Sequence, residues 1–220
     1  GPHLPVNTDV VIGAHFLSAL DQIDPKAQLI LPPVKVGCSA HHLDFDGTLS
    51  VPHRVMMDYV CSILDSVCGG GFRNILLFNS HGGNQGIGQV ILEDFGAAHP
   101  DCRIAMVTWW TLAQDSLAEL SKTGRFGTGH ACEFETSLMM AAGAIEPNVD
   151  LPSGEFFVPS HDWADSSMLH KSVGALYRSI RQISGGSGVI GQPDAATLEQ
   201  GHKITAAVVR RLEKVLTDLR

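Results

Sequence analysis

The sequence predicts an α/β fold in which a mainly parallel sheet is covered by helices on both faces. Short apolar runs bounded by Gly, Pro, Asn or Asp alternate with segments whose apolar residues recur at helical spacing. Of the 220 residues, 44% are hydrophobic and 17% are charged, which excludes a disordered chain, a coiled coil and a collagen. This length favours one domain, so we expect residues 1–220 to form a single unit.

Three segments have the composition of buried parallel strands. They are residues 28–37 (QLILPPVKVG), 73–78 (RNILLF) and 103–110 (RIAMVTWW). The first helix is expected over residues 10–20, with Thr8 or Asp9 as its N-cap. Further helices are expected from the N-cap candidate Ser50 to Gly69–Gly71, after residue 84, over 111–120, over 133–140 and on the stripe from Ile204 to Leu219.

Charge and cysteine content narrow the class of protein. The formal net charge is −8 and no run of Lys or Arg occurs, which argues against a nucleic-acid partner. The apolar stretches are too short to span a bilayer, so no membrane partner is expected. The five cysteines are odd in number and lack C-x-x-C spacing, so we expect reduced thiols and a cytoplasmic protein.

Two loops carry residues suited to metal binding and proton transfer. His81 follows an expected strand and is flanked by glycine, where parallel sheets collect their ligands. His130 precedes two acids, Glu133 and Glu135, at the start of an expected helix. Each feature has a structural alternative, because a loop histidine can simply flank a turn and acids are favoured in any first helical turn.

Together, three segments resemble the creatininase (creatinine amidohydrolase) family of metal-dependent hydrolases. They are residues 1–9 (GPHLPVNTD), 79–84 (NSHGGN) and 129–137 (GHACEFETS). Residues 37–48 are similar to the family's G-x-S-x-E-H-x-x-F-P-G-T stretch, and residues 188–201 extend the likeness. The resemblance implies a three-layer α/β/α fold that hydrolyses an amide with one or two divalent ions of zinc, manganese or iron. It also implies a homo-oligomer, a hexamer in relatives.

The resemblance assigns roles to matching positions of this sequence. Asp9 would bridge the metals, His81 would ligate one of them, and His130 would transfer the proton near the scissile bond. In creatininase proper, a ligating glutamate stands two residues after the middle histidine, where this chain has Gly83. We expect Glu133 to take over that coordination, since it offers a carboxylate on the neighbouring loop.

The family also has a Glu-x-His motif immediately before Gly-Pro-His, which would supply two more ligands. A divalent ion takes four to six N or O donors, more than Asp9, His81 and Glu133 provide. We therefore expect the native protein to continue upstream of Gly1 with a further strand that carries this motif.

The substrate is expected to be a small amide, cyclic or formyl, with Trp110, Asn84 and Glu135 among the residues that contact it. Relatives with the His-Gly-Gly-Asn form include deformylases, peptidases of a precursor peptide and hydrolases of cyclic sugar derivatives.

Two other functions fit parts of the sequence. Residues 43–49 (LDFDGTL) are similar to the signature of haloacid-dehalogenase-type phosphatases, in which Asp44 would be the nucleophile, Asp46 the acid/base and magnesium the cofactor. A non-catalytic binding subunit that keeps the fold but lacks part of the metal site is the other alternative.

Overall fold

A pair of parallel strands forms the centre of the molecule. The structure, a computed structural model, describes residues 1–154 and 156–220. Strand β1 (Asn74–Asn79) pairs with β2 (Arg103–Thr108), from Asn74 opposite Arg103 to Asn79 opposite Thr108. Both strands lie where the sequence predicts them. The second ends before Trp109 because the two tryptophans begin a helix, α4 (Trp109–Leu112).

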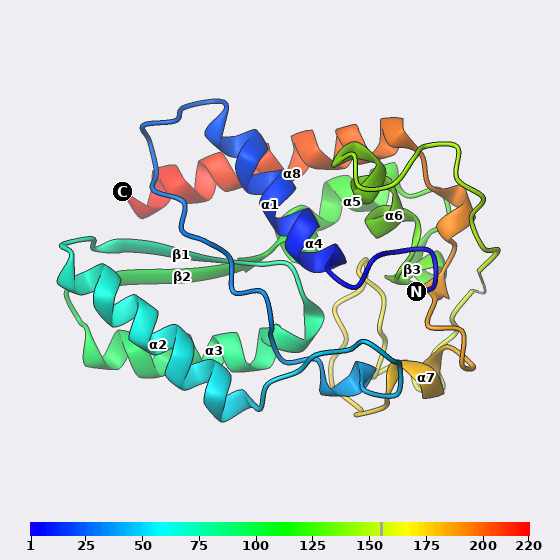
Figure 1. Cartoon of the computed structure of the whole chain (residues 1–220), viewed down its shortest axis with the longest axis horizontal. Helices are drawn as coiled ribbons and strands as arrows, with labels where there is room; N and C mark the ends of the chain where they lie inside the picture. Colours follow the sequence, from blue (N-terminus) through cyan, green and yellow to red (C-terminus); the bar gives the residue numbers. More distant parts are fainter. Residues whose placement is uncertain (155) are drawn as a thin grey trace.

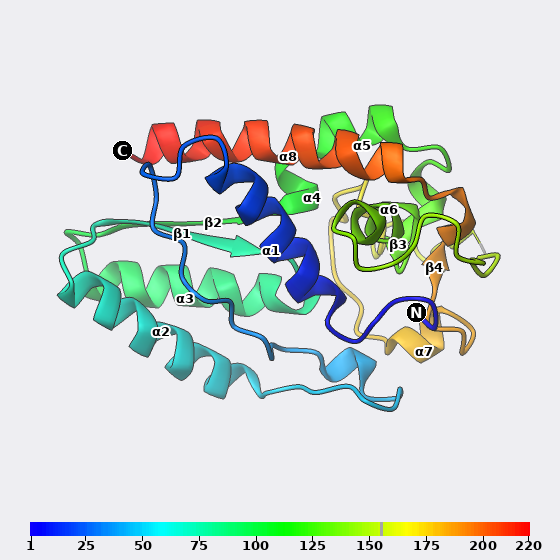
Figure 2. The ribbon, with the colours of Figure 1, turned by 45° about the horizontal axis from the view of Figure 1, so that its top comes forward.

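Helices cover both faces of this strand pair, as predicted. Helices α1 (Thr8–Asp21) and α8 (Leu198–Leu219) pack together on one face, and α2 (His53–Gly69) and α3 (Gln85–Ala98) pack together on the other (Figures 1 and 2). The fold is thus an α/β fold with a helix layer on each side of parallel strands.

Each face has its own hydrophobic core. One core joins α1, α6 and α8 around the fully buried side chains of Phe16, Trp109 and Leu212. The other lies between α2, α3 and β1 and includes Leu64 and Ile91. Burial of these apolar side chains supplies most of the favourable free energy of folding.

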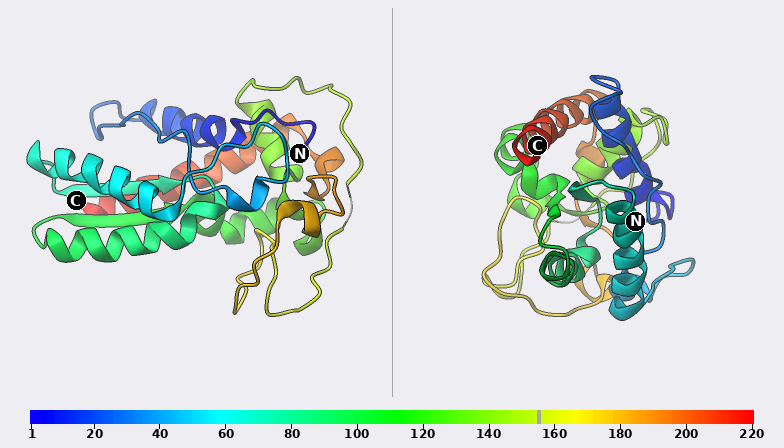
Figure 3. Two further views of the ribbon diagram at one scale, coloured as in Figure 1. Left: turned by 60° about the horizontal axis from the view of Figure 1, so that its bottom comes forward. Right: turned by 90° about the vertical axis from the view of Figure 1, so that its left-hand side faces the viewer.

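The remaining elements gather beyond the carboxyl ends of the strands (Figure 3). Strand β3 (Thr128–His130) pairs antiparallel with β4 (Ile190–Gly191), and α6 (Glu133–Ala141) follows β3 directly. Gly201 lets α8 lie against α6, since a Cβ at this position would collide with the carbonyl of Ser137. The short helices α5 (Gln114–Leu120) and α7 (Ile180–Ile183) complete this end of the molecule.

Several local expectations need correction. Residues 28–37, all described by the structure, form neither strand nor helix, because Pro32 and Pro33 lack the N–H groups that a ladder requires. The helix expected over 111–120 is interrupted at Ala113. Helix α2 begins after Pro52, not at Ser50, whose hydroxyl instead accepts the Ser39 N–H at 2.9 Å.

Two of the cysteines, which spacing left unpaired, lie next to each other. The sulfur atoms of Cys68 and Cys102 are in contact, whereas Cys38, Cys61 and Cys132 are free. The two cysteines meet because the end of α2 lies beside the segment that enters β2, which their spacing in the sequence does not reveal.

Within the described part of the chain, the helices all fall short of the length and apolar character that crossing a bilayer requires.

Candidate metal centre

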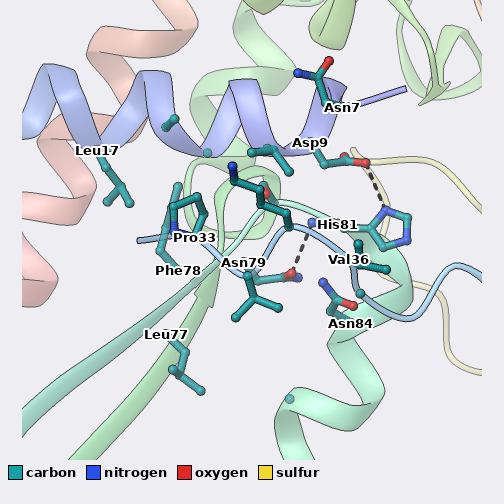
Figure 4. A pocket seen from close by; sticks show the side chains of 18 of the residues that line it. Asn7, Asp9, Leu17, Pro33, Val36, Leu77, Phe78, Asn79, His81 and Asn84 are labelled. Atoms are coloured by element: carbon teal, nitrogen blue, oxygen red, sulfur yellow. Dashed lines mark hydrogen bonds and ion pairs between the residues drawn. The ribbon is translucent and has the colours of Figure 1, made fainter. Parts of the chain in front are cut away.

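A deep pocket of about 1900 Å³ runs along β1 to the ends of the strands. Helix α1, the irregular segment that contains Pro33 and Val36, and strand β1 form its walls (Figure 4). Polar side chains collect at one end of it, around Asp9 and His81. This end lies where β1 and β2 point their carboxyl termini, the usual position of a ligand site in a parallel sheet.

Asp9 and His81 come together from two separate elements. Asp9 stands in the first turn of α1, and its Oδ2 lies 3.3 Å from Nδ1 of His81 (Figure 4). The loop that carries His81 is fixed because the backbone N–H of His81 donates to Oδ1 of Asn79 at 3.1 Å. The Asn79 side chain in turn donates to the hydroxyl of Thr108 at 3.0 Å, so the ends of both strands position this histidine.

Glu135 is the second carboxylate of this cluster. It lies in the first turn of α6, is 6% exposed, and accepts the backbone N–H of Ala131. That N–H is directed by a left-handed backbone at Ala131, with φ of 53°. Burial, with repulsion from Asp9 as the next cause, raises the pKa of Glu135 to about 7.

The electrostatics of the cluster favour a bound cation. Burial alone would lower the pKa of His81, but the Asp9 carboxylate outweighs it, with Glu135 adding to the effect, and the net pKa is raised. The carboxylates of Asp9 and Glu135 therefore both favour a positive charge at His81. Carboxylate oxygen and imidazole nitrogen are ligands of zinc, manganese and iron, so the donor set fits the divalent ion that the resemblance implies.

Three further histidines lie near His81, of which His42 and His130 line the same pocket and His41 lines a smaller one beside it. The ring of His42 lies 4.7 Å from that of His130 and 4.2 Å from that of His41, measured between centroids. Burial lowers the pKa of His41 to about 4 and that of His42 to about 3. It also lowers the pKa of His130 well below its usual value, with the neighbouring imidazoles adding to the effect. These rings are therefore neutral near pH 7 and can accept a proton or a metal ion.

Glu133 does not join the cluster, contrary to the expectation from sequence. Its side chain is fully buried, and both carboxylate oxygens accept hydrogen bonds from elsewhere. The donors are the Ser121 hydroxyl at 2.7 Å, the Lys122 N–H at 3.1 Å, the Thr123 N–H and hydroxyl at 3.1 and 2.7 Å, and the Gln200 amide at 2.8 Å. Glu133 thus anchors the loop before β3 to α8. Glu135, expected to contact substrate, is the acid of α6 that lines the pocket and whose pKa the charges of Asp9 and His81 affect.

Of the other two residues expected to contact substrate, Asn84 lines the pocket and Trp110 does not. Asn84 lines the pocket, but its Oδ1 accepts the Cys38 N–H at 3.0 Å and so fixes the loop at residues 37–39. Trp110 packs against the first core and lies edge-on to Trp109, and it is not among the described residues that line the pocket. The sequence motifs assign no role to His41 and His42, although both stand in a segment that resembles the family.

The phosphatase alternative does not fit the structure. A nucleophilic aspartate of that class directly follows a buried strand, but Asp44 follows a single turn of three-ten helix, Ala40–His42. Asp44 and Asp46 are both exposed, and the carbonyl of Asp44 accepts hydrogen bonds from Arg181. The likeness at residues 43–49 is therefore confined to the sequence.

The chain is similar to known hydrolases along its whole length. The chain is 26% identical to a 3-dehydro-scyllo-inosose hydrolase of Thermotoga maritima, over all of this chain and 73% of that protein. It is also 26% identical to a mycofactocin precursor peptide peptidase of Mycobacterium ulcerans, over 95% of this chain and 76% of that one.

The fold is that of creatininase. A crystal structure of creatinine amidohydrolase superimposes with a TM-score of 0.77 at 21% identity, over 99% of this chain and 85% of that one. A manganese form of creatininase gives a TM-score of 0.76 at 20% identity, with the same coverage. The family model for creatininase, described as creatinine amidohydrolase, matches residues 1–216. The chain therefore belongs to the creatininase family of hydrolases.

Proposed function

We propose that this protein is a metal-dependent amidohydrolase that acts on a small amide, cyclic or formyl, in the pocket beside β1. The observation that carries the proposal is that Asp9, His81 and Glu135, from α1, the loop after β1 and α6, line one pocket. Asp9 lies 3.3 Å from His81, and the charges of Asp9 and His81 both act on the pKa of Glu135. The half-exposed carboxylate of Asp9 and the buried one of Glu135 repel each other, and a divalent cation between them would remove this repulsion.

Asp9, His81 and Glu135 would hold this cation, zinc, manganese or iron, as one ion or a pair. Bound there, it would polarise a carbonyl and lower the pKa of a water molecule, which is the chemistry that amide hydrolysis requires. Asn79 and Ala131 keep the ligands in place through the hydrogen bonds described above. Apolar side chains such as Leu77 and Phe78 line the pocket around them.

His130 is the proton-transfer residue of the proposed reaction. Its neutral ring lies in the pocket beside His42 and close to the charges of the cluster. A neutral imidazole accepts a proton from the attacking water and can then deliver it to the leaving amine, which departs only when protonated. Because the pKa of His130 is lowered, the accepting form persists to acidic pH.

The remaining donors of the site would come from a further strand beside β1. Within residues 1–154 and 156–220, β1 is paired on one side with β2, and the pocket of about 1900 Å³ extends along the strand. This volume exceeds the roughly 300–1,000 Å³ of most small-ligand sites, so it has room for an added strand as well as a substrate. A Glu-x-His motif on that strand would complete the ligands.

The protein is also proposed to form a homo-oligomer in the cytoplasm. Several large apolar side chains on the long connection between α6 and α7 are exposed, among them Phe156 at 59%, Val173 at 87% and Tyr177 at 75%. Light scattering of the purified protein would test this, since a mass of one chain would contradict it.

Hydrolysis assays test the proposed activity. The purified protein, loaded with zinc, manganese or iron in turn, is offered an N-formyl amine, a cyclic amide and a carboxy-terminal peptide. Cleavage of at least one amide that disappears in both Asp9→Asn and His81→Gln supports the proposal. Metal-dependent hydrolysis of a phosphate ester with no amide cleavage would contradict it.

A further inference from the structure

Three imidazoles meet on the side of His81 that faces away from Asp9. One ring nitrogen from each of His41, His42 and His81 lies within 4.8 Å of the others. A single zinc ion bonded to nitrogens at about 2.0–2.1 Å keeps its ligands about 3.4 Å apart, so small rotations of these rings suffice to surround one. The His41 and His81 rings are nearly parallel, 15° apart, with centroids 5.4 Å from each other.

The two nitrogens of His81 point to different surroundings. Nδ1 lies 3.3 Å from Oδ2 of Asp9, whereas Nε2 lies 3.3 Å from the hydroxyl of Ser39, on the side of Gly83. Histidines that ligate a metal usually donate the opposite ring N–H to a carboxylate, which fixes the ring and its tautomer. With Asp9 holding the Nδ1 proton, a cation at Nε2 would replace the proton through which this ring bonds to the carbonyl of Cys38.

Gly83 makes room for the ring of His41. A Cβ at residue 83 would lie 2.7 Å from Cε1 of His41 and 2.8 Å from Nε2 of His81, and would also collide with the carbonyl of Cys38. A longer side chain at this position, such as a ligating glutamate, is excluded unless the Cys38 backbone and His41 both move. The imidazole of His41 thus stands next to the space that a side chain at position 83 would need.

We propose that His41 and His42 are metal ligands in this chain, and that with Nε2 of His81 they form a three-imidazole site for a borderline cation of the zinc class. The proposal rests on the proposed function, which places a divalent cation beside His81. It adds a nitrogen-donor position on one side of His81 to the carboxylate position of Asp9 and Glu135 on the other. Nitrogen donors favour zinc, cobalt or nickel, whereas the carboxylates suit manganese.

Zinc-edge X-ray absorption tests the inference, since its outer-shell scattering counts the imidazoles bound to zinc. At one equivalent of zinc, the wild-type spectrum should show three imidazoles, and His41→Gln and His42→Gln should each show two. Each variant should also bind zinc at least about tenfold more weakly. His53→Gln is the matched control, because His53 is exposed at the start of α2 and lies outside the cluster.

The outcomes separate this inference from the proposed function. A single imidazole in the wild-type spectrum, unchanged by His41→Gln, would overturn the three-imidazole site while leaving the carboxylate site intact, provided that Asp9→Asn still abolishes manganese binding. Absence of both zinc and manganese binding would overturn both proposals. Thermal unfolding of each variant, measured without metal, identifies any weak zinc binding that comes from a damaged fold.

Discussion

The carboxylate of Asp9 lies 3.3 Å from Nδ1 of His81, although 71 residues of chain separate these two positions. The contact exists because the first turn of α1 crosses the loop that leaves β1. We therefore expect substitution of Asp9 to weaken metal binding at the proposed centre most strongly.

Asp9→Asn should abolish manganese binding and reduce amide hydrolysis by at least about 10²-fold, because an amide cannot neutralise a divalent cation. Isothermal titration with manganese and a turnover assay would measure the two effects. Asp58→Asn, an exposed acid on α2, is the control for loss of one negative charge and should change neither. Full manganese binding by Asp9→Asn would remove this residue from the ligand set.

His130→Gln should leave metal content nearly unchanged and lower amide turnover by about 10²–10⁴-fold, as expected when a proton-transfer group is lost. An activated ester, whose leaving group departs without a proton, should lose much less. Equal losses on the amide and the ester would mean that His130 positions the carbonyl. Recovery of activity with excess metal would instead mark it as a ligand.

Glu133→Gln should lower the free energy of unfolding by about 2–4 kcal/mol without affecting metal binding, because it removes a buried charge that accepts several hydrogen bonds. Urea unfolding and metal analysis together measure the two quantities. Loss of bound manganese in a folded Glu133→Gln protein would restore the role that the sequence suggested for this residue.

Glu135→Gln should behave in the opposite way, losing manganese and stabilising the metal-free protein at pH 8. In the folded protein the pKa of Glu135 is about 7, above its usual value of 4.5, so the folded state retains this proton longer than the unfolded state. The destabilisation caused by Glu135 is therefore absent below pH 4.5 and grows as the pH rises towards 7.

The stability difference between Glu135→Gln and the metal-free wild type should accordingly widen across pH 4.5–7, by up to about 1.4 kcal/mol per pH unit, and then level off. Urea unfolding of both proteins at a series of pH values measures it. A difference that stays constant with pH would show that the carboxyl of Glu135 does not carry the raised pKa.

Much of the architecture was predictable because it depends on local patterns. The apolar runs of β1 and β2 and the periodic faces of α2 and α8 identify the layers without knowledge of contacts. The strand predicted over residues 28–37 is wrong. The apolar composition of this segment favours a strand, but Pro32 and Pro33 lack the N–H groups that strand pairing requires.

The site was predictable in part. Asp9, His81 and His130 lie at the pocket, as their motifs suggest. Glu133 and Glu135 stand two residues apart on α6, so their side chains point in different directions, and only the packing of α6 decides which one faces Asp9. The approach of His41 to His81 depends on Gly83 and on the turn at residues 40–42, which the sequence pattern does not specify.

The most direct test of the proposed metal centre is anomalous diffraction from crystals of the protein grown with manganese. The account predicts an anomalous peak within coordination distance of Asp9, His81 and Glu135. A crystal in which these side chains are ordered but no peak lies between them, or in which manganese lies beside Glu133 instead, would contradict it.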